Sequence, residues 1–138
     1  NNEPIKIFNK GNLVRDFTYI DDIIESLFRV IFKPAIKDKY FDTDNPNAST
    51  SWAPHRVFNI GNSSPIPLMD YINALEESLG KEAKKVYLSM QKGDVLSTYA
   101  NTSLLNEWID FKPKTPIKIG INNFVNWYKN FYQINLET

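Results

Sequence analysis

The chain has 138 residues, enough for one domain with a core of its own. Its 16 basic and 16 acidic residues cancel, so no overall field attracts a nucleic acid or an anionic membrane. Without cysteine, the chain has no disulfide, catalytic thiol or zinc–thiolate site, and its composition suits a reducing cytoplasm. No apolar run is long enough to span a bilayer. We expect a cytoplasmic protein, and the opening without methionine suggests a piece of a longer polypeptide.

The N-terminal stretch shows the pattern strand, turn, strand. Pro4–Phe8 alternates as a strand does, and Asn9–Asn12 is a cluster of turn residues. Residues 13–18 alternate again, which places Arg15 on one face of an otherwise mostly apolar ribbon and Asp16 on the other. Strands 5–8 and 13–18 are therefore expected to lie close together, with a hairpin as one arrangement.

A helix is expected from Thr18 to Phe32, with Thr18 as its N-cap and Asp21 as the acidic partner of the cap. Apolar residues recur at helical spacing and form a wide stripe. They are Ile20, Ile23, Ile24, Leu27, Phe28 and Ile31. Residues 35–54 are polar turn formers without periodicity, which predicts a long loop that is either functional or disordered.

The rest of the chain alternates strands with helices. Strands are predicted at 56–60 and 85–90, and helices after Pro67, from about Thr102, and after Thr115-Pro116. Residues expected to face inward are Leu68, Ile72, Leu75 and Leu79 in the first helix, Leu104, Leu105 and Trp108 in the second, and Ile117, Ile121, Phe124, Tyr128 and Phe131 in the third. We predict a single α/β unit over residues 1–138, in which strand 56–60 is suited to a parallel sheet that this chain does not supply.

Catalytic motifs are missing from the sequence. The lone His55 has no partner at metal-ligand spacing, and no metal is expected. There is no glycine-rich phosphate loop and no hydrolase nucleophile elbow. Asp21 and Asp22 are better explained as charges at a helix N-terminus than as an acid/base pair. No catalytic residue is therefore assigned in this chain.

Four residues are candidate recognition groups for a nucleotide sugar. Phe8 offers an aromatic face to a base, and Arg15 a planar fork of donors to a diphosphate. Asp94 can accept hydrogen bonds from sugar hydroxyls, and Gln91 can both donate and accept. Each has a structural alternative: Phe8 in the core, Arg15 in a salt bridge, Asp94 in a turn and Gln91 on the surface.

Several segments together resemble one family. Residues 7–22 resemble the start of the C-terminal half of extended short-chain dehydrogenase/reductases that act on nucleotide sugars. Further similarity follows in the same order along the chain. It lies in residues 53–62, 68–72, 90–95, 98–101 and 115–128. The loop that ends in Ala-Pro, with Met-Gln-Lys-Gly-Asp-Val at 90–95, looks most like UDP-glucuronate 4-epimerases.

The resemblance implies a role for each candidate residue. Phe8 lies against the uracil, Arg15 holds the diphosphate, and Asp94 with Gln91 meets the ribose or phosphate end of a UDP-sugar substrate. Enzymes of this kind, which serve polysaccharide biosynthesis and are usually homodimers, oxidise C4 of the sugar with bound NAD and return the hydride to the other face. Their NAD loop and Tyr-x-x-x-Lys pair belong to an N-terminal Rossmann domain that is absent from this chain, so no cofactor is expected on these 138 residues.

Two departures from the family pattern bear on the interpretation. Val14 stands where these epimerases often have a second Arg, which leaves the sugar open. Asp110 stands where a Gly usually ends the short helix, and a side chain is less favourable there at positive φ. Two alternatives also stay open: a free-standing, non-catalytic binding or interaction module, and a nucleotide-sugar dehydratase or decarboxylase of the same family.

Overall fold

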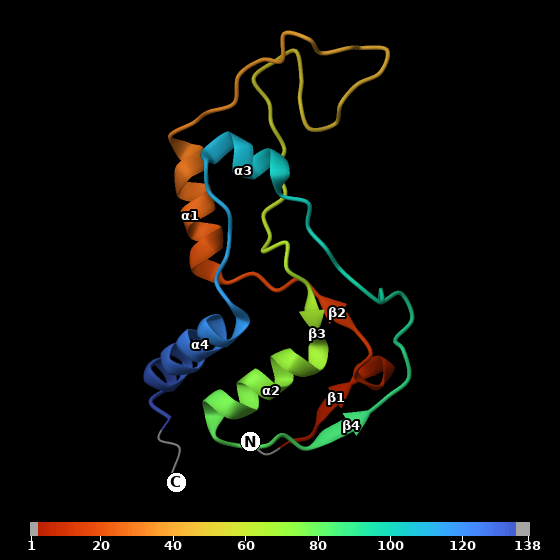
Figure 1. Ribbon diagram of the computed structural model, residues 1–138, viewed down its shortest axis with the longest axis vertical. Helices are drawn as coiled ribbons and strands as arrows, with labels where there is room; N and C mark the ends of the chain where they lie inside the picture. Colours follow the sequence, from red (N-terminus) through yellow and green to blue (C-terminus); the bar gives the residue numbers. More distant parts are fainter. Residues whose placement is uncertain (1–2, 135–138) are drawn as a thin grey trace.

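The computed structural model describes residues 3–134, in which two small sheets and a set of helices alternate along the chain (Figure 1). The strands are β1 (Ile5–Ile7), β2 (Val14–Arg15), β3 (Ile66–Pro67) and β4 (Lys85–Tyr87). The helices are η1 (Phe8–Gly11, a 3-10 turn), α1 (Ile20–Ile31), α2 (Leu68–Leu79), α3 (Ser103–Ile109) and α4 (Ile117–Tyr132). The α/β class expected from the sequence is confirmed.

The two N-terminal strands do not form a hairpin, so that expectation is wrong. β1 pairs in parallel with β4, with Ile5 opposite Lys85, and β2 pairs antiparallel with β3, with Val14 opposite Pro67. Between the two strands lies η1, where Asn9, Lys10 and Gly11 all have a left-handed backbone (φ 48°, 52° and 84°). This turn sends the chain to a different sheet instead of folding it back.

α2 and α4 pack against each other and form the hydrophobic core of the described residues (Figure 1). Ala74, Ile121 and Val125 are buried at its centre. Tyr71, Leu75, Leu79 and Ile117 pack around them. Three aromatic residues of α4 that were expected inside, Phe124, Tyr128 and Phe131, are exposed instead. Their rings contact one another and those of Trp127 and Tyr132 along the outer side of the helix, because the side toward α2 is filled by smaller residues.

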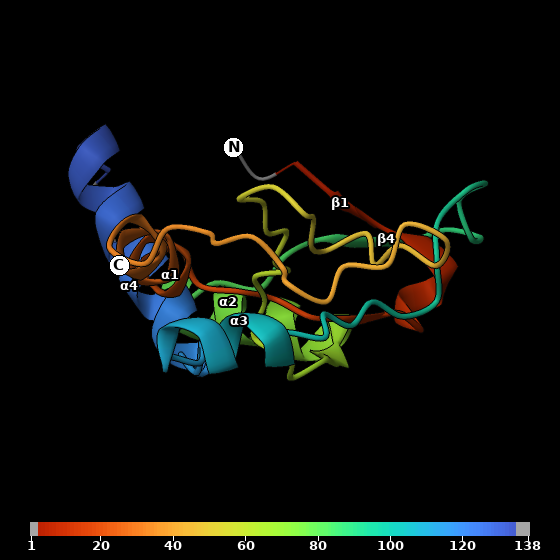
Figure 2. The ribbon, with the colours of Figure 1, turned by 90° about the horizontal axis from the view of Figure 1, so that it is seen from above.

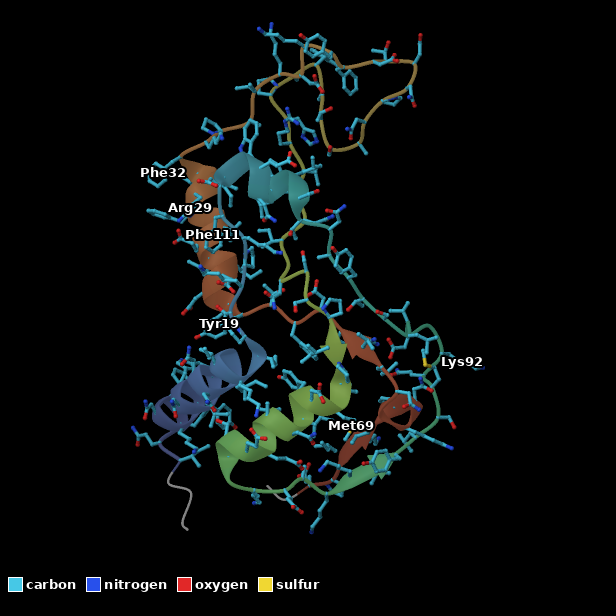
Figure 3. The ribbon with its side chains drawn as sticks, in the orientation of Figure 1. Tyr19, Arg29, Phe32, Met69, Lys92 and Phe111 are labelled. Carbon is cyan, nitrogen blue, oxygen red and sulfur yellow. The ribbon has the colours of Figure 1, made fainter. Side chains whose placement is uncertain are left out.

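α1 packs beside α3 and buries its polar side (Figure 3). Ser26 is fully buried, whereas Ile31 and Phe32 on the apolar stripe are 70% and 71% exposed. Arg29 holds the two helices together: its guanidinium lies over the ring of Phe111 and donates to the carbonyl of Asp110 at 3.3 Å. α1 therefore presents its apolar stripe outward.

Two expectations about helix details are also wrong. Thr18 does not cap α1, which begins after Tyr19; the Thr18 hydroxyl instead accepts a hydrogen bond from the Asn62 amide at 3.1 Å. In α3, Leu105 is buried as expected, but Leu104 is 52% exposed. Asp22 lies in the first turn of α1, as expected for an N-terminal charge, and it is also buried and accepts hydrogen bonds from two backbone amides just before α4.

The segment predicted as strand 56–60 is not a strand. Only Arg56 forms a β-bridge, to Thr50, and Val57 donates from its amide to the Ser49 carbonyl. Among the described residues no neighbouring strand lies beside 57–60, so the segment has the composition of a strand without a ladder. Figure 1 shows the preceding long loop, coloured orange to yellow, extending beyond α1 and α3, and Figure 2 shows the same loop from above.

No helix within residues 3–134 combines the length and apolar character that crossing a membrane requires.

We predict that Asp110→Gly stabilises the protein. Asp110 has a left-handed backbone (φ 49°) at the C-terminus of α3, where a Cβ is unfavourable and a negative charge opposes the helix dipole. We expect a gain of about 0.5–1 kcal/mol in the free energy of unfolding, measured by urea titration of the full-length protein. Asp110→Asn is the control, because it removes only the charge. If Gly stabilises no more than Asn, backbone strain is not the cause.

We also predict that Glu76 stabilises the fold in a pH-dependent way. Its carboxylate accepts from the Ala83 amide at 2.6 Å and pairs with Lys85, which joins α2 to β4. The hydrogen bond from Lys85, then that from Ala83, lowers the pKa of Glu76 below its usual 4.5. A lowered pKa in the folded state means that the stabilisation is present at neutral pH and is lost as the pH falls through that pKa.

The test is the difference in thermal midpoint between wild type and Glu76→Gln. We expect the variant to melt lower at neutral pH and the difference to shrink at about pH 3. Glu77→Gln is the matched control on the same helix: its pair with Lys118 is about two-thirds exposed and should contribute little. A difference that does not change with pH would contradict this assignment.

Candidate functional site

Arg15 and Asp94 form an ion pair at the edge of the two-stranded sheet β2–β3. The Arg15 Nη2 lies 2.6 Å from the Asp94 Oδ1, and the two side chains are 20% and 30% exposed. Arg15 is the last residue of β2, and Asp94 ends the turn 91–94 that follows β4. The structure thus brings together two of the four residues proposed from the sequence, although they are 79 positions apart.

The guanidinium of Arg15 is held from one side only. Its Nη1 donates to the Val14 carbonyl at 2.9 Å and to the Leu96 carbonyl at 3.3 Å. The Asp94 Oδ1 also accepts from the Val95 amide at 2.8 Å. Within the described residues, Arg15 Nε and Asp94 Oδ2 make no hydrogen bond. The cationic fork therefore keeps one edge for an oxyanion, and the carboxylate keeps one oxygen for a hydroxyl.

Phe8 and Gln91 lie on the segments that flank this pair. Phe8 begins η1, and backbone bonds from Leu88 to Ile7 and from Lys10 to Leu88 fix this turn beside β4. Gln91 is exposed, and its carbonyl accepts from the Asp94 amide at 3.2 Å, which closes the turn. In residues 3–134, neither side chain is hydrogen-bonded to the ion pair. Their predicted roles toward a ligand stay predictions.

Asp16 is a residue that the sequence reasoning did not single out. Its carboxylate accepts three backbone hydrogen bonds, from Ser63 at 3.1 Å, Ser64 at 3.2 Å and Ala100 at 3.0 Å. The strand alternation already placed Asp16 opposite Arg15, which would have been the available signal. A carboxylate that accepts three amide donors organises backbone and is poorly suited to contact a ligand.

The close packing at this position also explains why residue 61 is a glycine. A Cβ on Gly61 would lie 2.5 Å from the Cβ of Ala100 and 3.5 Å from an Asp16 carboxylate oxygen. Only a glycine lets the turn after residue 60 approach the 98–100 segment this closely. The scaffold behind Arg15 is therefore tightly packed.

A metal site is not supported by the described residues. No group of three His, Cys, Asp or Glu side chains is placed to hold an ion in the part of the chain that the structure describes. A cavity of about 470 Å³ lies nearby, lined by Phe17, Ser63, Ser64 and Lys112 among others, but none of the four candidate residues lines it. The Arg15–Asp94 pair instead lies on an open surface.

The chain matches proteins of known sequence over almost its whole length. It is 48% identical to the protein CapI of Staphylococcus aureus and 37% identical to a probable UDP-glucuronate 4-epimerase of Rhizobium meliloti, each over 96% of this chain. No family model matches. A crystal structure of UDP-glucuronic acid 4-epimerase from Bacillus cereus, in complex with UDP-glucuronic acid and NAD, superimposes with a TM-score of 0.70 at 26% identity, over 95% of this chain and 37% of that one.

The chain is homologous to the C-terminal part of nucleotide-sugar epimerases of the extended short-chain dehydrogenase/reductase family. It spans about 40% of the length of the curated relatives it matches first. The resemblance stated from the sequence is confirmed at this level, including the α/β fold of the family's C-terminal portion.

We predict that residue 61 must be a glycine because of its close contact with Ala100. Gly61→Ala should destabilise the protein by roughly 1–3 kcal/mol, because the added Cβ overpacks a rigid backbone contact. Adding Ala100→Gly removes the opposing Cβ and should restore most of the loss. The measurement is the urea unfolding of both variants; a double variant as unstable as the single one would contradict the explanation.

Proposed function

We propose that this chain is the substrate-binding part of an NAD-dependent nucleotide-sugar 4-epimerase, and that its substrate is UDP-glucuronate. The supporting observation is the Arg15–Asp94 pair, in which each partner keeps a free polar edge. The ligands in the crystal structure of the Bacillus cereus enzyme, UDP-glucuronic acid and NAD, agree with this assignment. The choice of glucuronate rests on that structure and on relatives named as UDP-glucuronate 4-epimerases.

In this proposal each candidate residue meets one part of the nucleotide. Arg15 binds the diphosphate through its Nε–H, which has no partner among the described residues, while Asp94 binds a ribose hydroxyl through its free Oδ2. Phe8 and Gln91, on the flanking segments, contact the uracil and the neighbouring phosphate or ribose. The ion pair sets the two groups side by side, as the adjoining ribose and diphosphate of a UDP-sugar require.

The residues of this chain do not fit NAD. The sequence has no glycine-rich phosphate loop and no Tyr with Lys four positions later. In the proposed enzyme NAD supplies hydride transfer at C4, and its ligands belong to a Rossmann domain of the same polypeptide. The part of the site described above holds the nucleotide end of the substrate.

The outward apolar stripe of α1 supports a second domain as partner. A helix that buries Ser26 and exposes Ile31 has an apolar face of the kind that another domain contacts. Residues 57–60, beyond the long loop that follows α1, have a strand composition but no ladder partner among the described residues. We infer that the Rossmann sheet of the parent protein accepts this segment as a strand and covers α1.

The test is the affinity of the full-length protein for UDP, measured by titration calorimetry. Arg15→Ala should weaken UDP binding by roughly ten- to a hundredfold, which is about 1.5–3 kcal/mol for a lost charged contact. Arg15→Lys should weaken it less, since charge remains but the fork is lost. Unchanged affinity in a folded Arg15→Ala variant would show that the diphosphate lies elsewhere.

Arg29→Ala is the matched control. Arg29 also pairs with a carboxylate, Glu25, and donates to backbone carbonyls, but it joins α1 to α3. It should lower stability and leave UDP affinity unchanged. Product analysis with UDP-glucuronate then separates 4-epimerisation from dehydration or decarboxylation, since only epimerisation returns an isomer of the substrate.

A further inference from the structure

The segment that carries Asp94 runs along β2 in a short parallel pairing. The chain between β4 and α3 passes the edge of β2 (Figure 1), where Val14 and Ser97 form a β-bridge. The Val14 amide donates to the Leu96 carbonyl at 2.9 Å, and the Thr98 amide donates to the Val14 carbonyl at 3.2 Å. These two backbone bonds are the first rungs of a ladder.

At Asp16 the next two hydrogen bonds of this ladder use side-chain acceptors in place of backbone carbonyls. Its amide donates to the Thr98 hydroxyl at 3.1 Å instead of to a carbonyl. Its carboxylate then accepts from the Ala100 amide at 3.0 Å, the donor that would otherwise bind the Asp16 carbonyl. The other two amide bonds, from Ser63 and Ser64, fix the same carboxylate to the turn after Gly61. The register of residues 94–100 along β2 is thus locked by Asp16.

The groups that orient the Arg15 guanidinium belong to residues 94–100. The Leu96 carbonyl and the Asp94 carboxylate hold the guanidinium at 3.3 and 2.6 Å. Any slip of residues 94–100 along β2 would move both contacts together. We propose that Asp16 is a positioning residue for nucleotide binding, which acts on Arg15 through residues 94–100. This inference rests on the proposed function, because it takes Arg15 as the diphosphate ligand.

A positioning role has a kinetic signature that a general loss of stability lacks. Asp16 lies on the opposite face of the strand from Arg15, and its carboxylate is already occupied by three amides, so it does not contact the substrate in this proposal. Misplacing Arg15 should raise the KM for UDP-glucuronate, while kcat for the folded enzyme should change little. Small displacements of a binding group are sufficient for such effects.

The experiment uses Asp16→Asn in the full-length protein. An amide has one acceptor oxygen, and its NH₂ faces a backbone donor, so at least one of the three amide bonds is lost. We expect UDP affinity to fall about tenfold and KM for UDP-glucuronate to rise in parallel, with kcat within about twofold of wild type. In the Arg15→Ala background, Asp16→Asn should have almost no further effect on UDP affinity.

Asp22→Asn is the matched control, because Asp22 is a buried carboxylate that accepts two backbone amides, from Lys114 and Thr115, away from the ion pair. It should lower the thermal midpoint and leave UDP affinity unchanged. If Asp16→Asn does not fold, Thr98→Val removes a single acceptor and should weaken UDP binding about threefold.

The outcomes separate the two proposals. If Arg15→Ala weakens UDP binding but a folded Asp16→Asn, or Thr98→Val in its place, binds UDP as wild type does, the positioning role is wrong and the proposed function stands. Equal losses of UDP affinity from Asp16→Asn with and without Arg15 would also overturn the positioning role. If Arg15→Ala has no effect, the proposed function itself fails.

Discussion

The carboxylate of Asp16 is the point at which three separate stretches of the chain meet. Asp16 directly follows β2, and its carboxylate accepts hydrogen bonds from the amides of the turn at 63–64 and of Ala100. The backbone amide of Asp16 donates to the Thr98 hydroxyl. Because one charged group satisfies three donors, the stretches are fixed relative to one another without a continuous sheet. Asp22 does the same on a smaller scale between α1 and the start of α4. Two carboxylates thus supply much of the order that longer strands provide in other folds.

In helix α1 the polar side is buried and the apolar side is exposed, which composition alone does not reveal. Its polar residues face α3, where Arg29 spans the two helices, and its apolar residues face away. The aromatic rings of α4 are exposed as well. Exposed apolar side chains on two helices are typical of a domain that packs against a neighbour.

The helices were predictable from the sequence, whereas the strands were predictable only in part: β1, β2 and β4 lie within expected strands, but 56–60 is not a strand and β3 was missed. Turn residues and apolar periodicity located the start of each α-helix to within about two residues. Periodicity shows that a helix has an apolar face but not whether another element packs against that face. Phe124 and Leu104 were therefore predicted to be buried, and both are exposed. The hairpin prediction failed because β1 and β2 each pair with a segment far along the chain, which local composition does not reveal. In the candidate site, residue chemistry identified Arg15 and Asp94, but their pairing and the role of Asp16 depend on contacts about eighty positions apart.

These long separations have a consequence for the order of events during synthesis. Ile5 pairs with Lys85, and Val14 pairs with Ser97, so neither β1 nor the edge of β2 finds its neighbour until some eighty further residues have left the ribosome. At translation rates of about 5–20 residues per second, this interval lasts roughly 4–16 s. High contact order of this kind slows closure of the native topology. The α2–α4 helix pair also waits for the last part of the chain, so docking of the N-terminal strands and assembly of the core are both late events.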